Sequence, residues 1–136
     1  MRFMILVRAT KTSEAGRFPD SFEEIASAMT DYHEELAKAG ALLDASGLQP
    51  SSKGWRVKYS GGERAVIDGP FTESKELIAG YTLIETKSRE EALEWSRRFP
   101  KPFEEDCEIE VRQLFDLEDL PESEAIRRFR EFAPRQ

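Results

Sequence analysis

The sequence predicts an α+β protein with a ferredoxin-like βαββ(β)αβ sandwich, in which two helices cover one face of an antiparallel sheet. Two observations lead to this fold class. Strand–helix–strand patterns occur twice, over residues 3–48 and 81–111, and a β-hairpin signal lies between them. No linker or low-complexity stretch interrupts this order, so we expect a single domain.

The first strand–helix–strand unit begins with a continuous apolar run at residues 3–7, bounded by arginines, which is typical of a buried strand. Ser21 and Glu24 then have the spacing of a capping box, with Ser21 as N-cap and Glu24 reaching back. We therefore expect a helix over residues 22–39, ended by the glycine that follows it. Residues 41–48 form the second predicted strand.

A β-hairpin is predicted in the middle of the chain. Trp55, Val57 and Tyr59 alternate with polar residues, which indicates a half-buried strand. Residues 60–63 contain two consecutive glycines and predict the turn, and residues 65–67 form the return strand.

The second strand–helix–strand unit starts with a strand over residues 81–86, rich in β-branched side chains. Ser88 and Glu91 repeat the capping-box spacing and open a helix that Pro100 ends. The last strand is predicted from the alternation of apolar and charged residues over 107–111.

Beyond the last strand, Pro121 opens a C-terminal helix with acidic residues early and arginines late, an order that suits the helix dipole. We expect residues 1–116 to form the domain and 117–136 a helical extension. The turn formers of residues 11–20 predict a loop, and residues 73–77 a single helical turn.

A sheet with helices on one side leaves its other side uncovered. The usual remedy is packing against the sheet of a second copy, which makes a symmetric homodimer. We expect this dimer, and the helical tail either covers part of the face or clasps the partner.

Composition narrows the classes of partner. The chain has 136 residues and a formal net charge of −7, which disfavours both a nucleic-acid binder and docking on an anionic membrane. The N-terminal apolar run is too short for a signal sequence or a spanning helix. We expect a soluble, cytoplasmic protein.

The Asp-Gly-Pro-Phe stretch at residues 68–71 follows a predicted strand directly. In the plainer interpretation, the Asp68 carboxylate accepts backbone N–H groups in an Asx turn and Phe71 plugs the core. In the functional interpretation, Asp68 is a polar wall of a pocket at the strand end, Phe71 contacts the ligand, and Lys75 binds an anion.

His33 is the single histidine of the chain. It lies four residues after Met29 and three before Leu36, so we expect it on the inward face of the first helix. It is either a satisfied, partly buried side chain bonded to a backbone carbonyl or a general base, since imidazole exchanges protons near neutral pH.

The remaining candidates are weaker. Tyr81 and Trp55 are aromatic strand residues that line either a ligand cavity or the core. Cys107 alternates with apolar positions and reads as a small core residue that forms no internal disulfide. One His and one Cys do not furnish the common nitrogen and sulfur ligand sets, so we predict no metal and no cofactor.

The segment DGPFTESKELIAGY, residues 68–81, closely resembles the signature of DGPF-domain proteins, which are part of the YCII-related family. Residues 32–51 are similar to the family's first helix and second strand, and IEVRQLFD, residues 109–116, to its last strand. The resemblance covers roughly residues 2–116. It implies a ferredoxin-like fold of the dimeric α/β-barrel class, usually a homodimer.

For function the resemblance implies several possibilities. Most members have no established activity, some are encoded beside or fused to extracytoplasmic-function sigma factors, and a few relatives are enzymes, including a muconolactone dehydrochlorinase. A His–Asp pair has been proposed as catalytic. His33 matches the family's histidine, but no Asp precedes Pro100, where the family's Asp–Pro element lies, so Asp68 or Asp44 would have to substitute.

Three hypotheses follow. The first is a homodimer of no established activity with a small-molecule pocket between helix and sheet, which accepts a small anionic ligand. The second is a lyase- or isomerase-like enzyme that acts on a cyclic acid or lactone, with His33 and Asp68 as catalytic residues. The third is an interaction or regulatory accessory linked to a sigma factor. Lys75, Tyr81 and Phe71 are the predicted ligand-binding residues.

Overall fold

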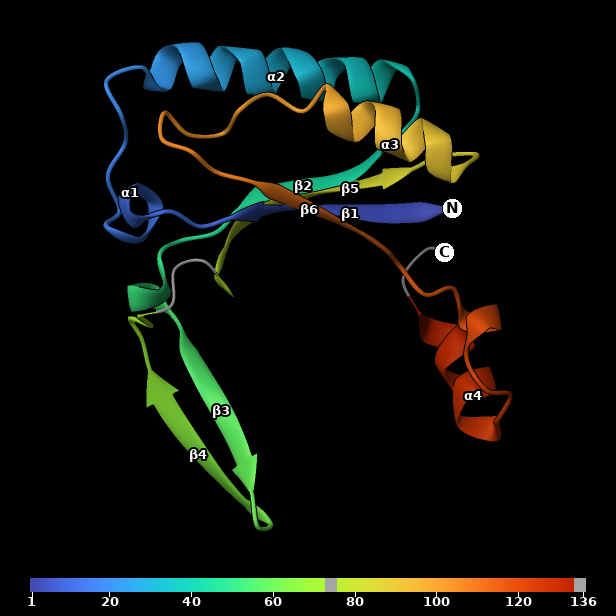
Figure 1. Cartoon of the computed structure of the whole chain (residues 1–136). Coiled ribbons are helices and arrows are strands. Elements are labelled where there is room, and N and C mark those ends of the chain that lie inside the picture. Colours follow the sequence, from blue (N-terminus) through green and yellow to red (C-terminus); the bar gives the residue numbers. More distant parts are fainter. Residues whose placement is uncertain (73–75, 134–136) are drawn as a thin grey trace.

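A four-stranded antiparallel sheet in the order β2-β5-β1-β6 forms the centre of the molecule in the computed structural model, which describes residues 1–72 and 76–133. The strands are β1 (Arg2–Arg8), β2 (Leu42–Gly47), β5 (Ile78–Glu85) and β6 (Ile109–Gln113). Helices α2 (Phe22–Lys38) and α3 (Arg89–Arg97) lie together on one face (Figure 1). The first strands of the two units, β1 and β5, are neighbours, as in a split βαβ arrangement. The fold is therefore α+β and compatible with the ferredoxin-like prediction.

The core lies between the sheet and these two helices. Alternate residues of β1 point into it, and Ile5 is fully buried together with Ile84 of β5 and Leu36 of α2. Ala92 brings α3 into the same cluster. This alternation is the period of two that a one-sided sheet requires.

The two predicted capping boxes have different outcomes. The Ser88 side chain accepts the Glu91 N–H at the start of α3, as predicted, whereas the Glu91 carboxylate accepts the Lys87 N–H rather than that of Ser88, so only one half of the box forms. Ser21 precedes α2 but makes no cap bond, because its hydroxyl and its backbone N–H both donate to the Glu104 carboxylate. The prediction of Ser21 as a side-chain cap was wrong, since a carboxylate distant in sequence competes for the hydroxyl.

The segment predicted as a loop at residues 11–20 contains one helical turn, α1 (Lys11–Glu14). Thr10 caps it by accepting the Ser13 N–H, and the Ser13 hydroxyl accepts the Thr10 N–H in return. The predicted helical turn at residues 73–77 lies in part outside the described residues.

The hairpin forms as predicted but is not half-buried. Strands β3 (Trp55–Ser60) and β4 (Glu63–Asp68) pair in register around Gly61 and Gly62, which both have positive φ. The pair makes a separate two-stranded sheet that extends away from the main sheet (Figure 1), and every one of its residues is exposed. The alternation of apolar and polar residues marks the strand correctly, but in the single chain the apolar side meets solvent.

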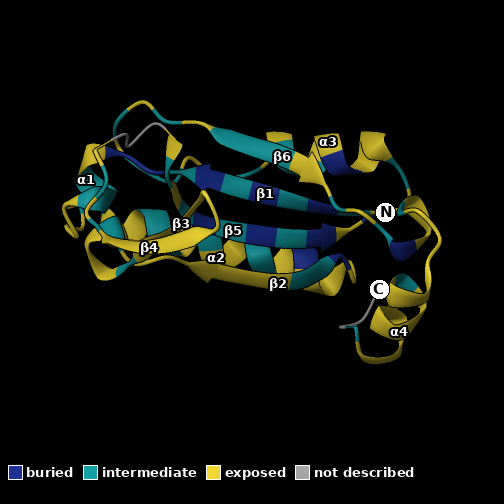
Figure 2. Ribbon diagram, turned by 90° about the horizontal axis from the view of Figure 1, so that it is seen from below, coloured by how far each residue is buried: buried dark blue, intermediate teal, exposed yellow. Residues whose placement is uncertain are grey.

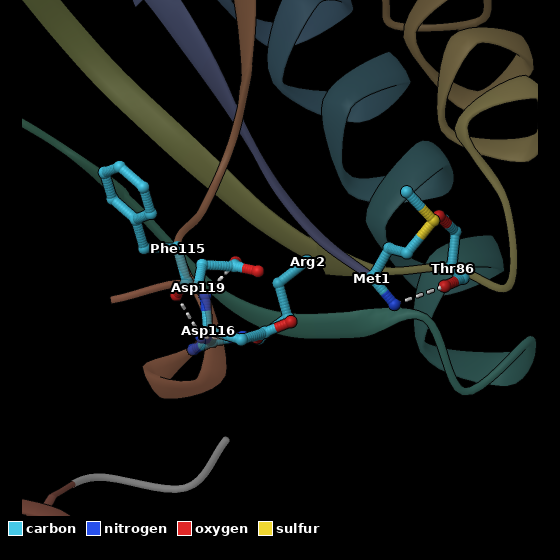
Figure 3. A network of polar contacts seen from close by, with 6 residues as sticks. All are labelled: Met1, Arg2, Thr86, Phe115, Asp116 and Asp119. Atoms are coloured by element: carbon cyan, nitrogen blue, oxygen red, sulfur yellow. Dashed lines mark hydrogen bonds and ion pairs between the residues drawn. The ribbon is translucent and has the colours of Figure 1, made fainter. Parts of the chain in front are cut away.

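The start of β1 is tied to two later parts of the chain (Figure 3). The Met1 amino group donates to the Thr86 carbonyl at 2.8 Å. Arg2 donates to the Phe115 carbonyl and forms an ion pair with Asp116 at 3.0 Å. The Met1 contact attaches the chain that leaves β5 to the beginning of β1, and the Arg2 contacts attach the chain that leaves β6.

After the Arg2–Asp116 ion pair the chain forms a 3-10 turn at Leu117–Asp119 and then α4 (Glu124–Phe132). The helix begins three residues after the predicted Pro121 start, at position 124, and its N-cap Ser123 accepts the Ile126 N–H. Figure 2 shows the face of the sheet opposite α2 and α3, with the β3–β4 hairpin over one end and α4 beyond the other.

That uncovered face carries apolar side chains. Met4 lies opposite Leu83, and Leu6 opposite Tyr81, on the two central strands. Their half-buried state contrasts with the fully buried Ile5 and Ile84 of the helix side. Within the described residues, no helix is long and apolar enough to cross a membrane.

Candidate functional site

A cavity of about 730 Å³ lies between α2 and the β2–β5 side of the sheet. Most of its lining is apolar and comes from α2 and from the chain after α3. The few polar or titratable residues in the lining are Thr30, His33, Glu34, Ser46, Tyr81 and Thr82. A cavity of this size with a few polar groups on an apolar wall is typical of small-molecule sites.

The imidazole of His33 faces this cavity and bonds at both nitrogens. Nδ1 lies 2.7 Å from the Met29 carbonyl oxygen, and Nε2 lies 2.8 Å from Thr82 Oγ1. A carbonyl only accepts, so Nδ1 carries the proton, and in the neutral ring Nε2 then accepts the Thr82 hydroxyl proton. His33 is half-buried, and Thr82 is 2% exposed. The ring is thus held in one tautomer and one orientation.

Aromatic rings pack beside the imidazole. Tyr32 and Phe99 approach it edge-on, with ring centroids 5.4 and 6.2 Å away. The Tyr32 hydroxyl donates to the Trp95 carbonyl at 2.7 Å, which joins α2 to α3. Burial raises the pKa of Tyr32 to about 12, against a smaller lowering by Arg98. Tyr32 therefore stays neutral next to the site at ordinary pH.

Neither predicted carboxylate partner is bonded to His33 in the described structure. Asp44 accepts the Tyr81 hydroxyl at 2.8 Å through Oδ2. Asp68 is exposed at the end of β4, opposite Trp55 in the hairpin register. The groups that hold the imidazole are a backbone carbonyl and a threonine hydroxyl, so the geometry is that of the satisfied histidine in the plainer interpretation.

Tyr81 borders the cavity, yet its side chain is directed elsewhere. Thr82 points to the helices, and neighbouring side chains of a strand alternate, so the Tyr81 ring lies on the uncovered face of the sheet. Its hydrogen bond to the Asp44 carboxylate raises the pKa of the Tyr81 phenol. Tyr81 and Asp44 thus form a hydrogen-bonded polar pair at the edge of the cavity.

The Asp-Gly-Pro-Phe turn lies outside the lining of this cavity and is hydrogen-bonded to the loop that contains Ser51. The Phe71 N–H donates to Ser51 Oγ at 2.9 Å, and Ser51 in turn donates to the Glu14 carboxylate. The Asx turn predicted for Asp68 was wrong, because Pro70 has no N–H and the N–H of Phe71 is taken by Ser51.

Phe71 is half-buried, with the Arg56 guanidinium 3.8 Å from its ring centroid, so it packs against the hairpin base. Gly69 is required by close packing. A Cβ atom there would lie 1.9 Å from the Ser51 carbonyl oxygen. The predicted anion-binding Lys75 lies outside the described residues.

Two contributors to the site were not predicted from the sequence, Thr82 and Phe99. Thr82 is a polar residue on the buried side of β5. Because side chains alternate along a strand, a Tyr81 on one face predicts a Thr82 that faces the helices. Phe99 follows α3 and carried no local signal of its role. Cys107 is half-buried, and no group of three or more metal-ligating side chains occurs in the part of the chain that the structure describes.

A second cavity of about 510 Å³ adjoins the first and shares Phe22, Ile25 and Phe103 with it. Arg17 lies in its lining. The two hollows therefore run along the same side of α2, from the His33 end toward α1.

The YCII-related domain matches residues 1–118. The chain belongs to the YCII-related family. A relative, an uncharacterized protein of Rhizobium meliloti (strain 1021), is 32% identical over 92 residues, which are 68% of this chain and 74% of that protein. In this YCII-related protein the family match ends at residue 118, just after the Arg2–Asp116 ion pair, so α4 lies outside the matched residues.

Among solved structures, the chain is similar to a 5-chloro-2-hydroxyhydroquinone dehydrochlorinase of Burkholderia phenoliruptrix AC1100, in complex with 2,5-dihydroxybenzoquinone. The identity is 14% and the TM-score 0.42, over 85% of this chain and 94% of the other.

Proposed function

We propose that this protein is a homodimer that binds a small, largely apolar molecule in the cavity beneath α2, with one polar end of the ligand at His33 and Thr82. The observation that carries the proposal is an apolar cavity of about 730 Å³ into which a single oriented imidazole projects. Specific orientation by few polar groups on an apolar wall is how most such sites select a ligand.

The hydrogen bonds of the site indicate what the ligand offers. The His33 N–H donates to the Met29 carbonyl, and the Thr82 hydroxyl donates to Nε2 of His33. Neither side chain therefore has a further proton to donate to a ligand. Thr82 Oγ1 still has lone pairs that accept. A ligand hydroxyl or amide proton is therefore favoured at this end. The anionic ligand predicted from Lys75 stays a prediction.

The homodimer is supported by the uncovered sheet face. Met4, Leu6 and Leu83 lie on it without a second layer among the described residues. Apolar faces of this kind are commonly buried against another sheet about 10 Å away.

A matched pair of probes tests the pocket, namely 2-naphthol, which carries one O–H donor, and naphthalene, which carries none. We expect wild-type protein to bind 2-naphthol more tightly, as measured by its fluorescence. Ala26→Phe fills the cavity from α2 and is expected to abolish binding of both probes. Ala28→Phe, on the exposed side of the same helix, is the control.

Equal binding by the Ala26→Phe and wild-type proteins would remove the pocket as the site. Loss of the preference for 2-naphthol in Thr82→Val, with naphthalene still bound, is the expected sign that the polar end contacts the ligand.

Proton-transfer catalysis is the second candidate, and the tautomer of His33 favours it. Nε2 is the unprotonated nitrogen, the form that a general base requires, and it becomes available to a substrate proton when the Thr82 hydroxyl turns away from its lone pair. We expect such an enzyme to exchange an acidic C–H proton of an unsaturated lactone with solvent deuterium. NMR would detect this exchange, and its persistence in His33→Gln would exclude His33 as the base. The accessory role beside a sigma factor stays a prediction.

A further inference from the structure

We infer that the β3–β4 hairpin of one copy packs on helix α4 of a second copy. The inference rests on the proposed homodimer but goes beyond it, because it assigns a partner surface to two elements that the small-molecule pocket does not use.

The hairpin carries an apolar stripe on one side. Residues directly opposite in an antiparallel pair share a face, so Val57 and Val66 lie side by side, flanked by Trp55 and Tyr59. Their exposed fractions are 65% for Trp55, 68% for Tyr59 and 69% for Val66. Exposed aromatic and β-branched side chains in one contiguous stripe are typical of a surface that another chain covers.

Helix α4 offers a second stripe. Ile126, Phe129 and Phe132 recur at intervals of three, so they lie along one side of the helix. The two phenylalanine rings contact each other with centroids 5.0 Å apart, and Phe132 is 72% exposed. Apart from Ala125, arginines and glutamates occupy the other positions of the helix. A helix this amphipathic is stabilised mainly by packing of its apolar side.

The positions of the β3–β4 hairpin and α4 are compatible with a two-fold symmetry axis between two copies. Both extend from the uncovered face of the sheet, the hairpin at one end of the strands and α4 at the other (Figures 1 and 2). A two-fold axis that lies between two facing sheets and runs across the strands turns the partner end for end. The hairpin of each copy then meets the α4 end of the other, which gives two identical contacts and a closed dimer.

The available area is of the size that a stable dimer needs. A fully buried aromatic side chain covers roughly 150–250 Å², so the exposed parts of the four aromatic side chains in the two stripes amount to roughly 500 Å² per copy by the same measure. Standard interfaces bury roughly 800 Å² per partner. The exposed valines of the hairpin stripe, Val57 and Val66, and the partly exposed apolar side chains of the sheet face, Met4, Leu6 and Leu83, add to this area.

Two variants test the contact. The hairpin variant combines Trp55→Ser and Tyr59→Ser, and the tail variant combines Phe129→Ser and Phe132→Ser. All four positions are exposed in the single chain, so folding is expected to persist, which circular dichroism checks. Sedimentation of each variant alone is expected to show a dimer Kd raised about ten-fold or more, the effect of losing an aromatic anchor. Leu93→Ser, on the exposed surface of α3, is the control with unchanged Kd.

The decisive measurement is an equimolar mixture of the two variants, separated by native mass spectrometry. Each homodimer lacks both hairpin–α4 contacts, whereas the mixed dimer keeps one intact contact. We therefore expect the mixed dimer to exceed its statistical share of one half clearly. If the two stripes bound unrelated surfaces, the mixed dimer would lie midway between the homodimers, and a statistical mixture overturns the inference.

The other outcomes separate this inference from the proposed function. A dimeric wild type whose variants dimerise equally well overturns the hairpin–α4 contact alone. A monomeric wild type overturns both the contact and the proposed homodimer, and binding of 2-naphthol then reports separately on the pocket.

Discussion

Thr82 has a single hydroxyl proton, and it donates this proton to Nε2 of His33 when the imidazole is neutral. The bond spans 49 positions of sequence and joins the centre of β5 to the C-terminal half of α2. Because both groups are largely removed from water, the loss of one leaves the other unsatisfied, and that cost exceeds the net value of the bond itself.

Thr82→Val keeps the shape of the side chain and removes the hydroxyl. We expect the free energy of unfolding to fall by about 1–3 kcal/mol, since Nε2 of His33 loses its donor. Urea denaturation followed by circular dichroism measures this change. Thr30→Val is the matched control, because Thr30 borders the same cavity but is exposed, and we expect a change within about 0.5 kcal/mol. Equal losses in the two variants would contradict the assigned bond.

Gly69 gives a second prediction at the residue scale. Gly69→Ala places a Cβ atom against the Ser51 carbonyl oxygen, so the backbone must shift, and we expect a loss of about 1–3 kcal/mol. Gly47→Ala is the control, since nothing lies within 4 Å of the Cβ position there and φ is not positive. Thermal unfolding compares the two. An unchanged melting temperature in Gly69→Ala would mean that the turn packs differently from the structure.

At the scale of elements, α2 and α3 are joined mainly by Tyr32. Its hydroxyl donates to the Trp95 carbonyl, and its ring packs edge-on against Trp95 and Phe99. Arg98 adds an exposed contact, with its guanidinium 4.4 Å from the Trp95 ring centroid and an ion pair to Glu35. We assign little stability to that ion pair, because exposed pairs contribute at most about 1 kcal/mol.

The pKa of Tyr32 makes this joint sensitive to alkali. An unfolded tyrosine ionises near pH 10, whereas Tyr32 in the folded protein has a pKa of about 12. Between these values the unfolded chain releases a proton that the folded chain keeps, so stability is complete below pH 10 and falls as the pH rises through 12. Urea denaturation of wild type and Tyr32→Phe from pH 9 to 12 measures this, and we expect the wild-type advantage to shrink with rising pH.

At the scale of the whole molecule, the uncovered sheet face decides the oligomeric state that we propose. Leu83 lies opposite Met4 on the two central strands of that face. Leu83→Glu would bury a charge between two packed sheets, which is costly without a partner. We expect a folded monomer by sedimentation and circular dichroism. Leu93→Glu, on the exposed surface of α3, is expected to leave the dimer intact, and equal behaviour of the two variants would place the interface elsewhere.

The local pattern of the chain was sufficient for most elements of the fold. The apolar run at residues 3–7 predicts the central strand, and the spacing of Met29, His33 and Leu36 predicts the inward side of α2, where the structure also has the imidazole. Hairpin turn chemistry at Gly61 and Gly62 is equally local. These features depend on side-chain period and backbone freedom, which neighbours within a few residues determine.

Partners distant in sequence were decided only by the tertiary structure. Glu104 takes the Ser21 hydroxyl away from the helix start, Ser51 takes the N–H of Phe71 that the Asx turn needed, and Thr82 rather than a carboxylate meets His33. The hairpin alternation predicted burial, yet its apolar stripe is exposed in the single chain. Local pattern thus determined which segments are strands and helices, whereas hydrogen-bond partners and burial depend on which groups the fold brings within about 3 Å, and no local period encodes that distance.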